Sequence, residues 1–347
     1  MSKQIRVLVV DDSALVRQIL TSVLSADPGI EVVGVAVDPF DAREKIKVLN
    51  PDVITLDVEM PRMSGLDFLE KLMRLRPMPV VMVSTLTQKG AEATIEALSL
   101  GAVDFVAKPT SAAALGALGE EIVGKIRNAA STRVRPFRNA PKAERPAAVP
   151  TARRMLRKLI AIGSSTGGVE AVTELISGLP NDSPPVVITQ HMPPHYTASF
   201  AQRLDKTAQV RVHEATDGQK LQRGHVYIAP GGRHLKLDRF GEEFRCVLND
   251  DAPVTGHRPS VDVLFHSVAE AAGKAAVGVI LTGMGRDGAQ GLKNLRDHGA
   301  NTFGQDELSC VVYGMPRAAK EVGAVEQELP LGRIAQALIR ACLDTGQ

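Results

Sequence analysis

A glycine-rich loop that begins with two adjacent serines marks the second half of the chain. In "LIAIGSSTGGVEAV", residues 159–172, four apolar residues lead into Gly163, and apolar residues resume at helical spacing after the loop. Ser164 and Ser165 compete as candidate nucleophiles, and spacing alone does not choose between them. The glycines and a helix that starts near Val169 also suit a bound phosphate, because helix N-terminal amides attract negative charge.

Two further polar residues follow apolar stretches that are typical of buried strands. "PVVITQ" leads directly into His191, and "AVGVILTG" leads into "MGRDG", which contains Asp287. The carboxyl ends of parallel strands meet at one edge of a sheet, so we expect the serine loop, His191 and Asp287 to converge there. A hydroxyl, an imidazole and a carboxylate are the nucleophile, general base and orienting acid of a serine hydrolase.

The order of these groups along the chain differs from that of the common serine hydrolases. It runs Ser, His, Asp, whereas in α/β-hydrolases it runs Ser, acid, His. The sequence "GSSTG" would place Ser165 at the centre of a G-x-S-x-G elbow, but its local context is only weak evidence for such a turn. The rival interpretation is a nucleotide-binding loop, but the loop has neither the P-loop lysine nor the G-x-G-x-x-G spacing. Local chemistry therefore favours the hydrolase and leaves the phosphate cradle as the alternative.

Backbone amides near the loop are candidates for stabilising the oxyanion that forms when a serine attacks a carbonyl. Thr166 and Gly167 are the candidates on the loop itself, and the amide of Met284, close to Asp287 in sequence, is a candidate second donor. Met284 and Met192 can equally be packing residues.

A catalytic zinc ion is not expected. His191 and His195 have the spacing of helical metal ligands, but Pro193 and Pro194 lie between them and disfavour a continuous helix. No nearby Glu or Cys completes a ligand set. We expect the other histidines to be surface or core residues with local partners: His213, His225, His234, His257, His266 and His298.

The stretch "GHRPSVD", residues 256–262, predicts a turn in which Ser260 caps a helix. Its histidine and arginine are candidates for lining a substrate entrance.

A second polar set occupies strand ends in the first half of the chain. Asp11 and Asp12 follow the first apolar run, Asp57 ends the third, Ser84 follows the fourth, and Lys108 follows the fifth. Carboxylates in one pocket repel one another unless a cation lies among them, and oxygen ligands suit Mg²⁺. A carboxylate beside Mg²⁺ and a lysine can accept a phosphoryl group, which the Ser84 hydroxyl can then bond. Helix capping explains single acids after strands but not the whole set.

Apolar runs alternate with amphipathic helical patterns in both halves, which predicts an α/β protein of two domains. Residues 1–130 predict a flavodoxin-like (βα)5 domain with a parallel sheet. Residues 131–154 carry four prolines and many arginines, so we expect a linker. Residues 155–347 predict a doubly wound, mostly parallel domain. Turn signals predict antiparallel strands inserted near residues 224–250.

The composition of the 347 residues narrows the class of protein. A net charge of +2 does not indicate nucleic-acid binding, and 3% aromatic residues without Trp weigh against a base-stacking surface. Three distant cysteines suggest neither a disulfide framework nor a zinc site. The N-terminus reads as a first strand rather than a signal peptide, and no apolar run reaches the roughly 18 residues of a membrane helix. We therefore expect a cytoplasmic protein without membrane insertion.

The acidic set of the first half resembles the receiver domain of two-component response regulators. "DVEMPRMSG" around Asp57 and "KP" at 108–109 strengthen the match. The resemblance implies that Asp57 is the phosphoacceptor. It also implies that Asp11 and Asp12 hold Mg²⁺, directly or through water, with the backbone carbonyl of Glu59 as a further ligand.

The second half resembles the catalytic domain of the protein-glutamate methylesterase/protein-glutamine glutaminase family. The matching motifs are "AIGSSTGGVEA", "ITQHMPPHYTASFAQRL", "VYIAPGG", "HRPSVDVLF" and "LTGMGRDGAQGL". In this family the nucleophile is the serine directly before Thr-Gly-Gly, so the resemblance selects Ser165. It assigns the base to His191 and the orienting acid to Asp287.

Together the two resemblances imply a phosphorylation-activated hydrolase of chemotaxis adaptation or a related chemosensory pathway. Its implied substrates are glutamate γ-methyl esters, cleaved with release of methanol, and specific glutamines of methyl-accepting chemoreceptors. The implied phosphodonor is a chemotaxis histidine kinase; Mg²⁺ belongs to the receiver, and the esterase chemistry needs no cofactor. We expect a monomer that binds no nucleic acid, in which the unphosphorylated receiver covers the catalytic edge. A response regulator whose output domain only binds a partner or a nucleotide is the alternative.

Overall fold

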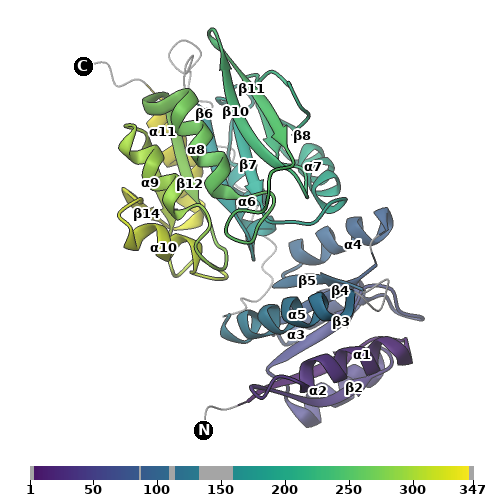
Figure 1. Cartoon of the computed structure of the whole chain (residues 1–347). Coiled ribbons are helices and arrows are strands. Elements are labelled where there is room, and N and C mark those ends of the chain that lie inside the picture. Colours follow the sequence, from purple (N-terminus) through teal and green to yellow (C-terminus); the bar gives the residue numbers. More distant parts are fainter. Residues whose placement is uncertain (1–3, 86, 109–113, 133–158, 344–347) are drawn as a thin grey trace. The chain divides into compact units, whose positions relative to one another are not determined.

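A computed structural model describes residues 4–85, 87–108, 114–132 and 159–343. The chain divides into two compact units, Met1–Asn139 and Ala140–Gln347, which are treated separately (Figure 1). The predicted linker at 131–154 lies outside the described residues except for its first two positions.

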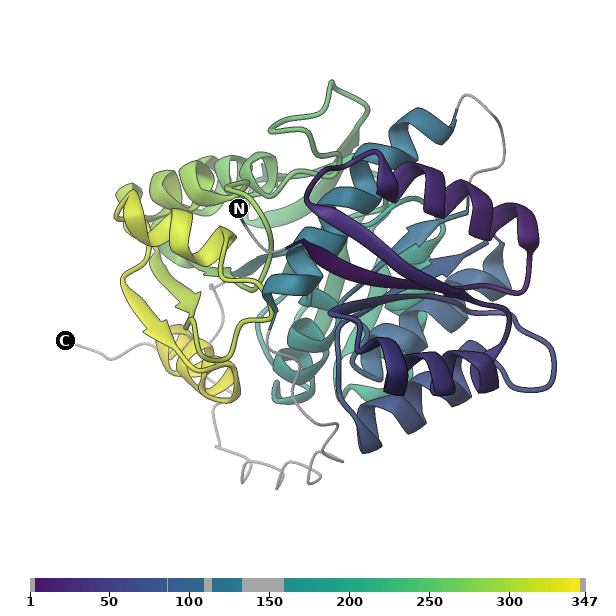
Figure 2. The same cartoon turned by 90° about the horizontal axis from the view of Figure 1, so that it is seen from below.

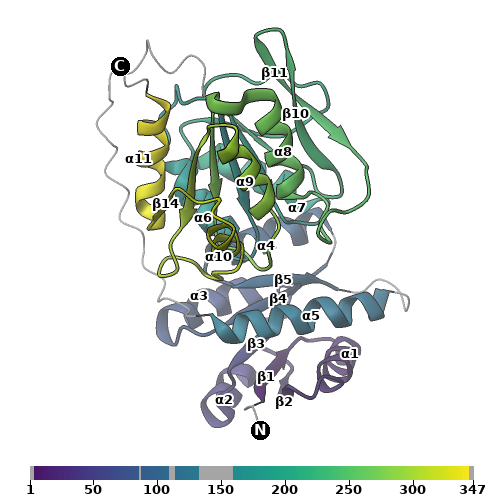
Figure 3. The ribbon, with the colours of Figure 1, turned by 60° about the vertical axis from the view of Figure 1, so that its left-hand side comes forward.

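The first unit is a five-stranded parallel sheet with helices on both faces (Figures 2 and 3). The strand order β2-β1-β3-β4-β5 is that of flavodoxin-like folds, as predicted. Its buried strands coincide with the continuous apolar runs of the sequence, because parallel strands are covered on both faces. The elements are β1 (Ile5–Val10), α1 (Ala14–Ser25), β2 (Ile30–Ala36), α2 (Pro39–Leu49), β3 (Val53–Asp57), α3 (Gly65–Leu75), β4 (Val80–Ser84), α4 (Gln88–Ser99), β5 (Asp104–Ala107) and α5 (Ala114–Ser131).

The second unit contains a seven-stranded sheet of order β14-β13-β12-β6-β7-β9-β8, in which every pairing is parallel. Its first elements are β6 (Leu159–Ser164), α6 (Gly168–Ser177), β7 (Val186–Gln190), α7 (Tyr196–Thr207), β8 (Arg211–Glu214), β9 (His225–Ile228), β10 (His234–Phe240) and β11 (Glu243–Asn249). The others are α8 (Val261–Ala272), a 3₁₀ turn (Gly273–Ala275), β12 (Ala276–Ile280), α9 (Ala289–Asp297), β13 (Asn301–Gln305), α10 (Met315–Glu321), β14 (Gln327–Leu329) and α11 (Leu331–Cys342).

The predicted antiparallel insertion is confirmed for β10 and β11, which pair across the turn at Phe240 and Gly241 and pack against α8 (Figures 1 and 3). It is wrong for His225–Ile228, because β9 joins the large sheet in parallel with β7 and β8. The turn signal at Pro230–Gly232 therefore marks the exit from the large sheet rather than a hairpin.

Each sheet has a point where the chain reverses the direction in which it adds strands. In the first sheet this point lies between β1 and β3, and in the second it lies between β6 and β12. Loops after the carboxyl ends of such neighbouring strands diverge and leave room for a ligand. Asp11, Asp12 and Asp57 end or follow the two strands at the first point, and Ser165 and Asp287 follow the two strands at the second. Ser84, Lys108 and His191 end or follow neighbouring strands of the same sheets, so the topology brings each set to one edge.

No helix among the described residues is both long and apolar enough to cross a membrane.

Candidate active site

The two adjacent serines at the end of β6 have different environments. Ser164 is fully buried, and its hydroxyl donates to Gln190 Oε1 at 2.6 Å. Ser165 follows the strand and is only partly buried, and its backbone N–H donates to the carbonyl oxygen of Thr282 at 3.0 Å. Because a nucleophile must reach its substrate, the geometry favours Ser165, which spacing alone could not select.

Gln190, the last residue of β7, joins the serine loop to the histidine. Its Nε2 atom donates to the backbone carbonyl oxygens of Ser165 at 2.9 Å and His191 at 3.1 Å, while its Oε1 atom accepts from Ser164. Sequence analysis gave this residue no role. The available signal was an amide at the end of an apolar strand, since a buried amide requires hydrogen-bond partners.

Close packing accounts for two glycines of the loop. A Cβ atom on Gly168 would lie 2.0 Å from Gln190 Oε1, and one on Gly167 would lie 2.5 Å from Val311 Cβ. Gly167 also has φ +77°, in the left-handed region that favours glycine. These glycines therefore let protein segments approach one another, whereas the sequence suggested an approach to a ligand.

His191 and Asp287 form the pair that the sequence predicted. His191 Nε2 lies 2.7 Å from Asp287 Oδ2, and both side chains are buried. The Nδ1 atom of His191 is also buried and has no hydrogen-bond partner within the described parts of the chain. With Nε2 held by the carboxylate, Nδ1 is the ring nitrogen that remains for proton transfer.

Asp287 lies against the N-terminus of α8, and its carboxylate accepts several hydrogen bonds there. Its Oδ1 atom accepts from the Ser260 hydroxyl at 2.7 Å and the Asp262 N–H at 3.1 Å, and its Oδ2 atom accepts from the Val261 N–H at 2.7 Å. Burial alone would raise the pKa of Asp287, but the hydrogen bond and charge of His191, with these donors, hold it well below its usual value. The carboxylate is therefore ionised at neutral pH and can stabilise an imidazolium.

His257, predicted as an ordinary surface or core histidine, has the candidate base as its partner. Its ring stacks on that of His191 with centroids 3.7 Å apart and an interplanar angle of 12°. The rest of this stretch folds as predicted, because Ser260 caps α8 and accepts from the N–H of Val263 at 3.4 Å. Local sequence could not reveal the stack, since the two histidines come from distant segments.

The predicted oxyanion donors lie in the loops after β6 and β12. The carbonyl oxygen of Thr166 accepts from Thr282 Oγ1 at 3.0 Å, which fixes the serine loop to the end of β12. The side chain of Met284 is 48% exposed, whereas Met192 is buried, so packing explains Met192 only. The oxyanion roles of Thr166, Gly167 and Met284 stay predictions.

The other predicted local histidines have nearby partners. α7 begins at Tyr196, so no helix joins His191 to His195. The contacts are His213 Nε2 with His225 Nδ1 at 2.9 Å, His234 with the Ser260 N–H at 3.2 Å and the Ala252 carbonyl at 3.1 Å, His266 with Asn294 at 3.0 Å, and His298 with the Asn294 carbonyl at 2.8 Å.

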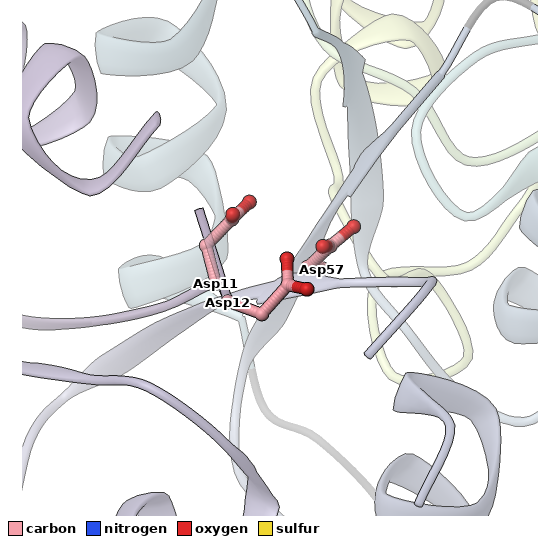
Figure 4. Close-up of side chains that lie close together, drawn as sticks. All are labelled: Asp11, Asp12 and Asp57. Atoms are coloured by element: carbon pink, nitrogen blue, oxygen red, sulfur yellow. The ribbon is translucent and has the colours of Figure 1, made fainter. Parts of the chain in front are cut away.

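In the first unit, three aspartates meet at the ends of β1 and β3 (Figure 4). One carboxylate oxygen from each of Asp11, Asp12 and Asp57 lies within 4.8 Å of the others. Lys108 Nζ lies 3.0 Å from Asp11 Oδ2 and 2.8 Å from Asp57 Oδ2. The Glu59 N–H donates to Asp57 Oδ1 at 3.3 Å, so the backbone of Glu59 borders the cluster.

Capping does not explain the aspartates after β1. Ser13 caps α1 and accepts from the N–H of Val16, while Asp11 Oδ1 only accepts from the N–H of Ser13. Burial raises the pKa of Asp57 to about 6, and the charge of Asp11 adds to this effect against the opposing contact with Lys108. Three carboxylates with a single ammonium group fit a hard divalent cation such as Mg²⁺.

Ser84 lies at the end of β4, as predicted, and is fully buried. Its hydroxyl donates to the carbonyl oxygen of Gly90 at 3.1 Å. A bond from this hydroxyl to a phosphate on Asp57 therefore requires it to leave Gly90.

Comparison with known families matches both units. A family model described as CheB methylesterase matches residues 160–338, and one described as response regulator receiver domain matches residues 7–118. A protein-glutamate methylesterase/protein-glutamine glutaminase of Caulobacter vibrioides is 58% identical over 340 residues, which cover 97% of each chain. One of Salmonella typhimurium is 54% identical over 354 residues, covering 100% of this chain and 99% of the relative.

A solved structure supports the fold of the second unit. The CheB methylesterase catalytic domain of Thermotoga maritima is 39% identical with a TM-score of 0.52, and the match covers 53% of this chain and 97% of that one.

Replacing Asp287 by Asn tests whether the buried carboxylate of this residue stabilises the second unit. We expect the free energy of unfolding of the second unit to fall by about 2 to 4 kcal/mol at pH 7, because the amide carries no charge and cannot accept every bond. The pKa of Asp287 is lower in the folded state than in the unfolded state, so its contribution is present above about pH 4 and is lost as the pH falls further. The difference between the two proteins should therefore begin to shrink as the pH falls below about 4, the usual pKa of an unfolded Asp, and should go on shrinking as the pH falls toward the lowered pKa of the folded state.

Urea unfolding followed by tyrosine emission measures this effect, because the chain has no Trp and its three Tyr lie in the second unit. Asp297→Asn is the matched control, since Asp297 is exposed and pairs only with Lys293 on α9. Equal losses of unfolding free energy in the two variants would contradict a stabilising role of the Asp287 carboxylate.

Proposed function

Because this chain belongs to the protein-glutamate methylesterase/protein-glutamine glutaminase family, we propose that its second unit hydrolyses glutamate γ-methyl esters and deamidates glutamines on methyl-accepting chemoreceptors. The observation that carries the proposal is the buried pair of His191 and Asp287, 2.7 Å apart, which follows the strands on either side of the one that delivers Ser165. The proposed substrates lie on the cytoplasmic part of a receptor, so we propose that the enzyme acts in the cytoplasm. We further propose that it acts as a monomer and binds no nucleic acid.

In the proposed mechanism, Ser165 Oγ attacks the γ-carbonyl carbon while Nδ1 of His191 takes its proton. The Nε2–H of His191 donates to Asp287, which fixes the tautomer and stabilises the imidazolium. His191 then gives this proton to the departing methoxide, which leaves as methanol, and water, activated by the same base, hydrolyses the acyl-enzyme. A glutamine amide follows the same course with release of ammonia.

The proposed oxyanion donors are backbone amides of Thr166, Gly167 and Met284. The first two belong to the turn before α6, where amides and the helix dipole favour negative charge. The bond from Thr282 Oγ1 to the Thr166 carbonyl supports a fixed position for this turn. No cofactor takes part in these proposed steps.

We propose that Asp57 accepts a phosphoryl group from a histidine kinase. The site fits Mg²⁺, held by Asp11, Asp12 and Asp57 with the Glu59 carbonyl, and the ion when bound supplies charge neutralisation for phosphoryl transfer. Lys108 contributes a fixed positive charge beside Asp57, and Ser84 supplies a hydroxyl to the product.

Phosphorylation of Asp57 is proposed to activate the hydrolase. Residues 1–130 are assigned to the receiver, 131–154 to a linker and 155–347 to the catalytic domain. In the proposed scheme the unphosphorylated receiver restricts access to the catalytic edge, and phosphorylation shifts the population toward an accessible state.

The serine assignment is tested by methanol release from methylated receptor. We expect Ser165→Ala to lower kcat on the order of 10⁴-fold or more with the fold intact, because the nucleophile is lost. Ser164→Ala should instead cost about 1 to 3 kcal/mol of stability and keep measurable activity, because it leaves Gln190 Oε1 without its donor. Activity that survives Ser165→Ala, or that is lost only in Ser164→Ala, would reject the assignment.

The activation scheme is tested with a small phosphodonor and Mg²⁺. The donor should raise the esterase rate of the wild-type chain and leave Asp57→Asn unchanged, because the amide cannot form an acyl phosphate. Chelating Mg²⁺ should abolish the increase without changing the basal rate. Asp67→Asn on α3 is a control that should respond like wild type, since Asp67 is exposed and its side chain accepts a hydrogen bond from Ser64 at the helix start. A basal rate unchanged by deleting residues 1–150 would contradict the restriction of access.

A further inference from the structure

His257 contacts the face of the catalytic imidazole. Its ring centroid lies 3.7 Å from that of His191 with the planes 12° apart, whereas His213 and His225 lie 5.1 Å and 20° apart. We propose that His257 is a positioning residue that fixes the plane of the His191 ring, so that Nδ1 stays available to Ser165. This inference rests on the proposed function, because it takes His191 as the general base.

The hydrogen bond to Asp287 is not enough to fix the base. It restrains His191 at Nε2 and leaves the ring free to tilt about that point, and the outer torsion of a histidine side chain is broad. A flat contact over the whole ring opposes that tilt. The stack therefore supplies the restraint that the carboxylate does not.

The backbone around His257 is suited to holding a ring in place. Val254 and His257 exchange two backbone hydrogen bonds, of 3.0 and 2.9 Å, across Thr255 and Gly256. Both central residues have positive φ, +51° and +82°, as in the tight two-residue turns of β-hairpins. A β-branched residue rarely adopts such a conformation, and Thr255 is exposed, so the two hydrogen bonds between Val254 and His257 are the contacts that close the turn around it.

The next residue anchors this turn to its surroundings. Arg258 Nη1 donates to the carbonyl oxygens of Asp250 at 2.9 Å and Asp251 at 3.2 Å, and the carbonyl of Arg258 accepts from the Gly232 N–H at 3.2 Å. The turn is therefore tied to the end of β11 and to the loop after β9.

One short segment holds both members of the catalytic pair. His257 covers the face of His191, and a few residues later Ser260, Val261 and Asp262 donate to Asp287. The ring and the carboxylate are thus positioned relative to each other by the same stretch of backbone.

The charge state of His257 is compatible with this role. Burial and the charge of His191 lower the pKa of His257 to about 4, against the opposing effect of Asp287. At neutral pH the stacked ring is therefore uncharged and does not repel the imidazolium that forms on His191.

Kinetics of the full chain with methylated receptor test the proposal. We expect His257→Ala to lower kcat by about 10- to 100-fold with little change in KM, because a misdirected base slows chemistry and not binding. His257→Phe should recover most of kcat, since it restores a flat ring without nitrogen atoms. His225→Ala, which removes a stacked histidine from β9, is the matched control and should behave like wild type.

A measurement that does not depend on activity follows the His191 ring directly. In protein labelled with ¹⁵N-histidine, the Nε2–H of His191 should give a downfield NMR signal that disappears in Asp287→Asn. We expect His257→Ala to broaden this signal by faster exchange with water and His257→Phe to retain it.

Several outcomes would overturn the proposal: full activity of His257→Ala, a His257→Phe variant as slow as His257→Ala, or a change confined to KM. An unchanged His191 signal in His257→Ala would do the same. If wild-type protein released no methanol, or Ser165→Ala remained active, the proposed function would fail instead, and the NMR comparison would still decide whether His257 fixes the ring.

Discussion

The buried carboxylate of Asp287 is the constraint on which the catalytic edge depends. An unpaired charge in an interior is strongly unfavourable, so this group must be surrounded by donors. The donors come from the start of α8 and from His191 after β7, while the carboxylate itself follows β12. Satisfying one charge therefore joins a helix start to the ends of two strands, and the imidazole is aligned as a consequence.

The aspartate cluster of the receiver unit has the opposite electrostatic arrangement, with several carboxylates and few donors. Its three aspartates lack such a set of donors, and Lys108 supplies one positive charge to Asp11 and Asp57. Their repulsion and burial leave Asp57 with a raised pKa, so the cluster stores unfavourable electrostatic energy that a divalent cation relieves. In the second unit several donors surround one carboxylate that holds the candidate base, whereas in the first unit three carboxylates share few donors and form a candidate cation site.

The amide of Gln190 links the backbones of the candidate nucleophile and the candidate base. It bonds the backbone of Ser165 and of His191 simultaneously, and Gly168 leaves room for its oxygen atom. Because the bonds go to main-chain atoms, the spacing of the two loops depends on Gln190 rather than on the reacting side chains. The hydrogen bonds of Gln190 thus restrain the backbones of both loops and leave the side chains of Ser165 and His191 available for the proposed chemistry.

The sequence by itself determined the parallel strands, the two sets of strand-end residues and the pairing of His191 with Asp287. Short continuous apolar runs that alternate with amphipathic helical patterns are typical of parallel strands covered on both faces, and the carboxyl ends of such strands meet at one edge. Tertiary structure alone decided which of the two serines is fully buried, the parallel pairing of β9, the bridge through Gln190 and the stack of His257 on His191. These features depend on contacts between segments far apart in the chain, and neither periodicity nor local turn chemistry records which distant side chain fills a given space.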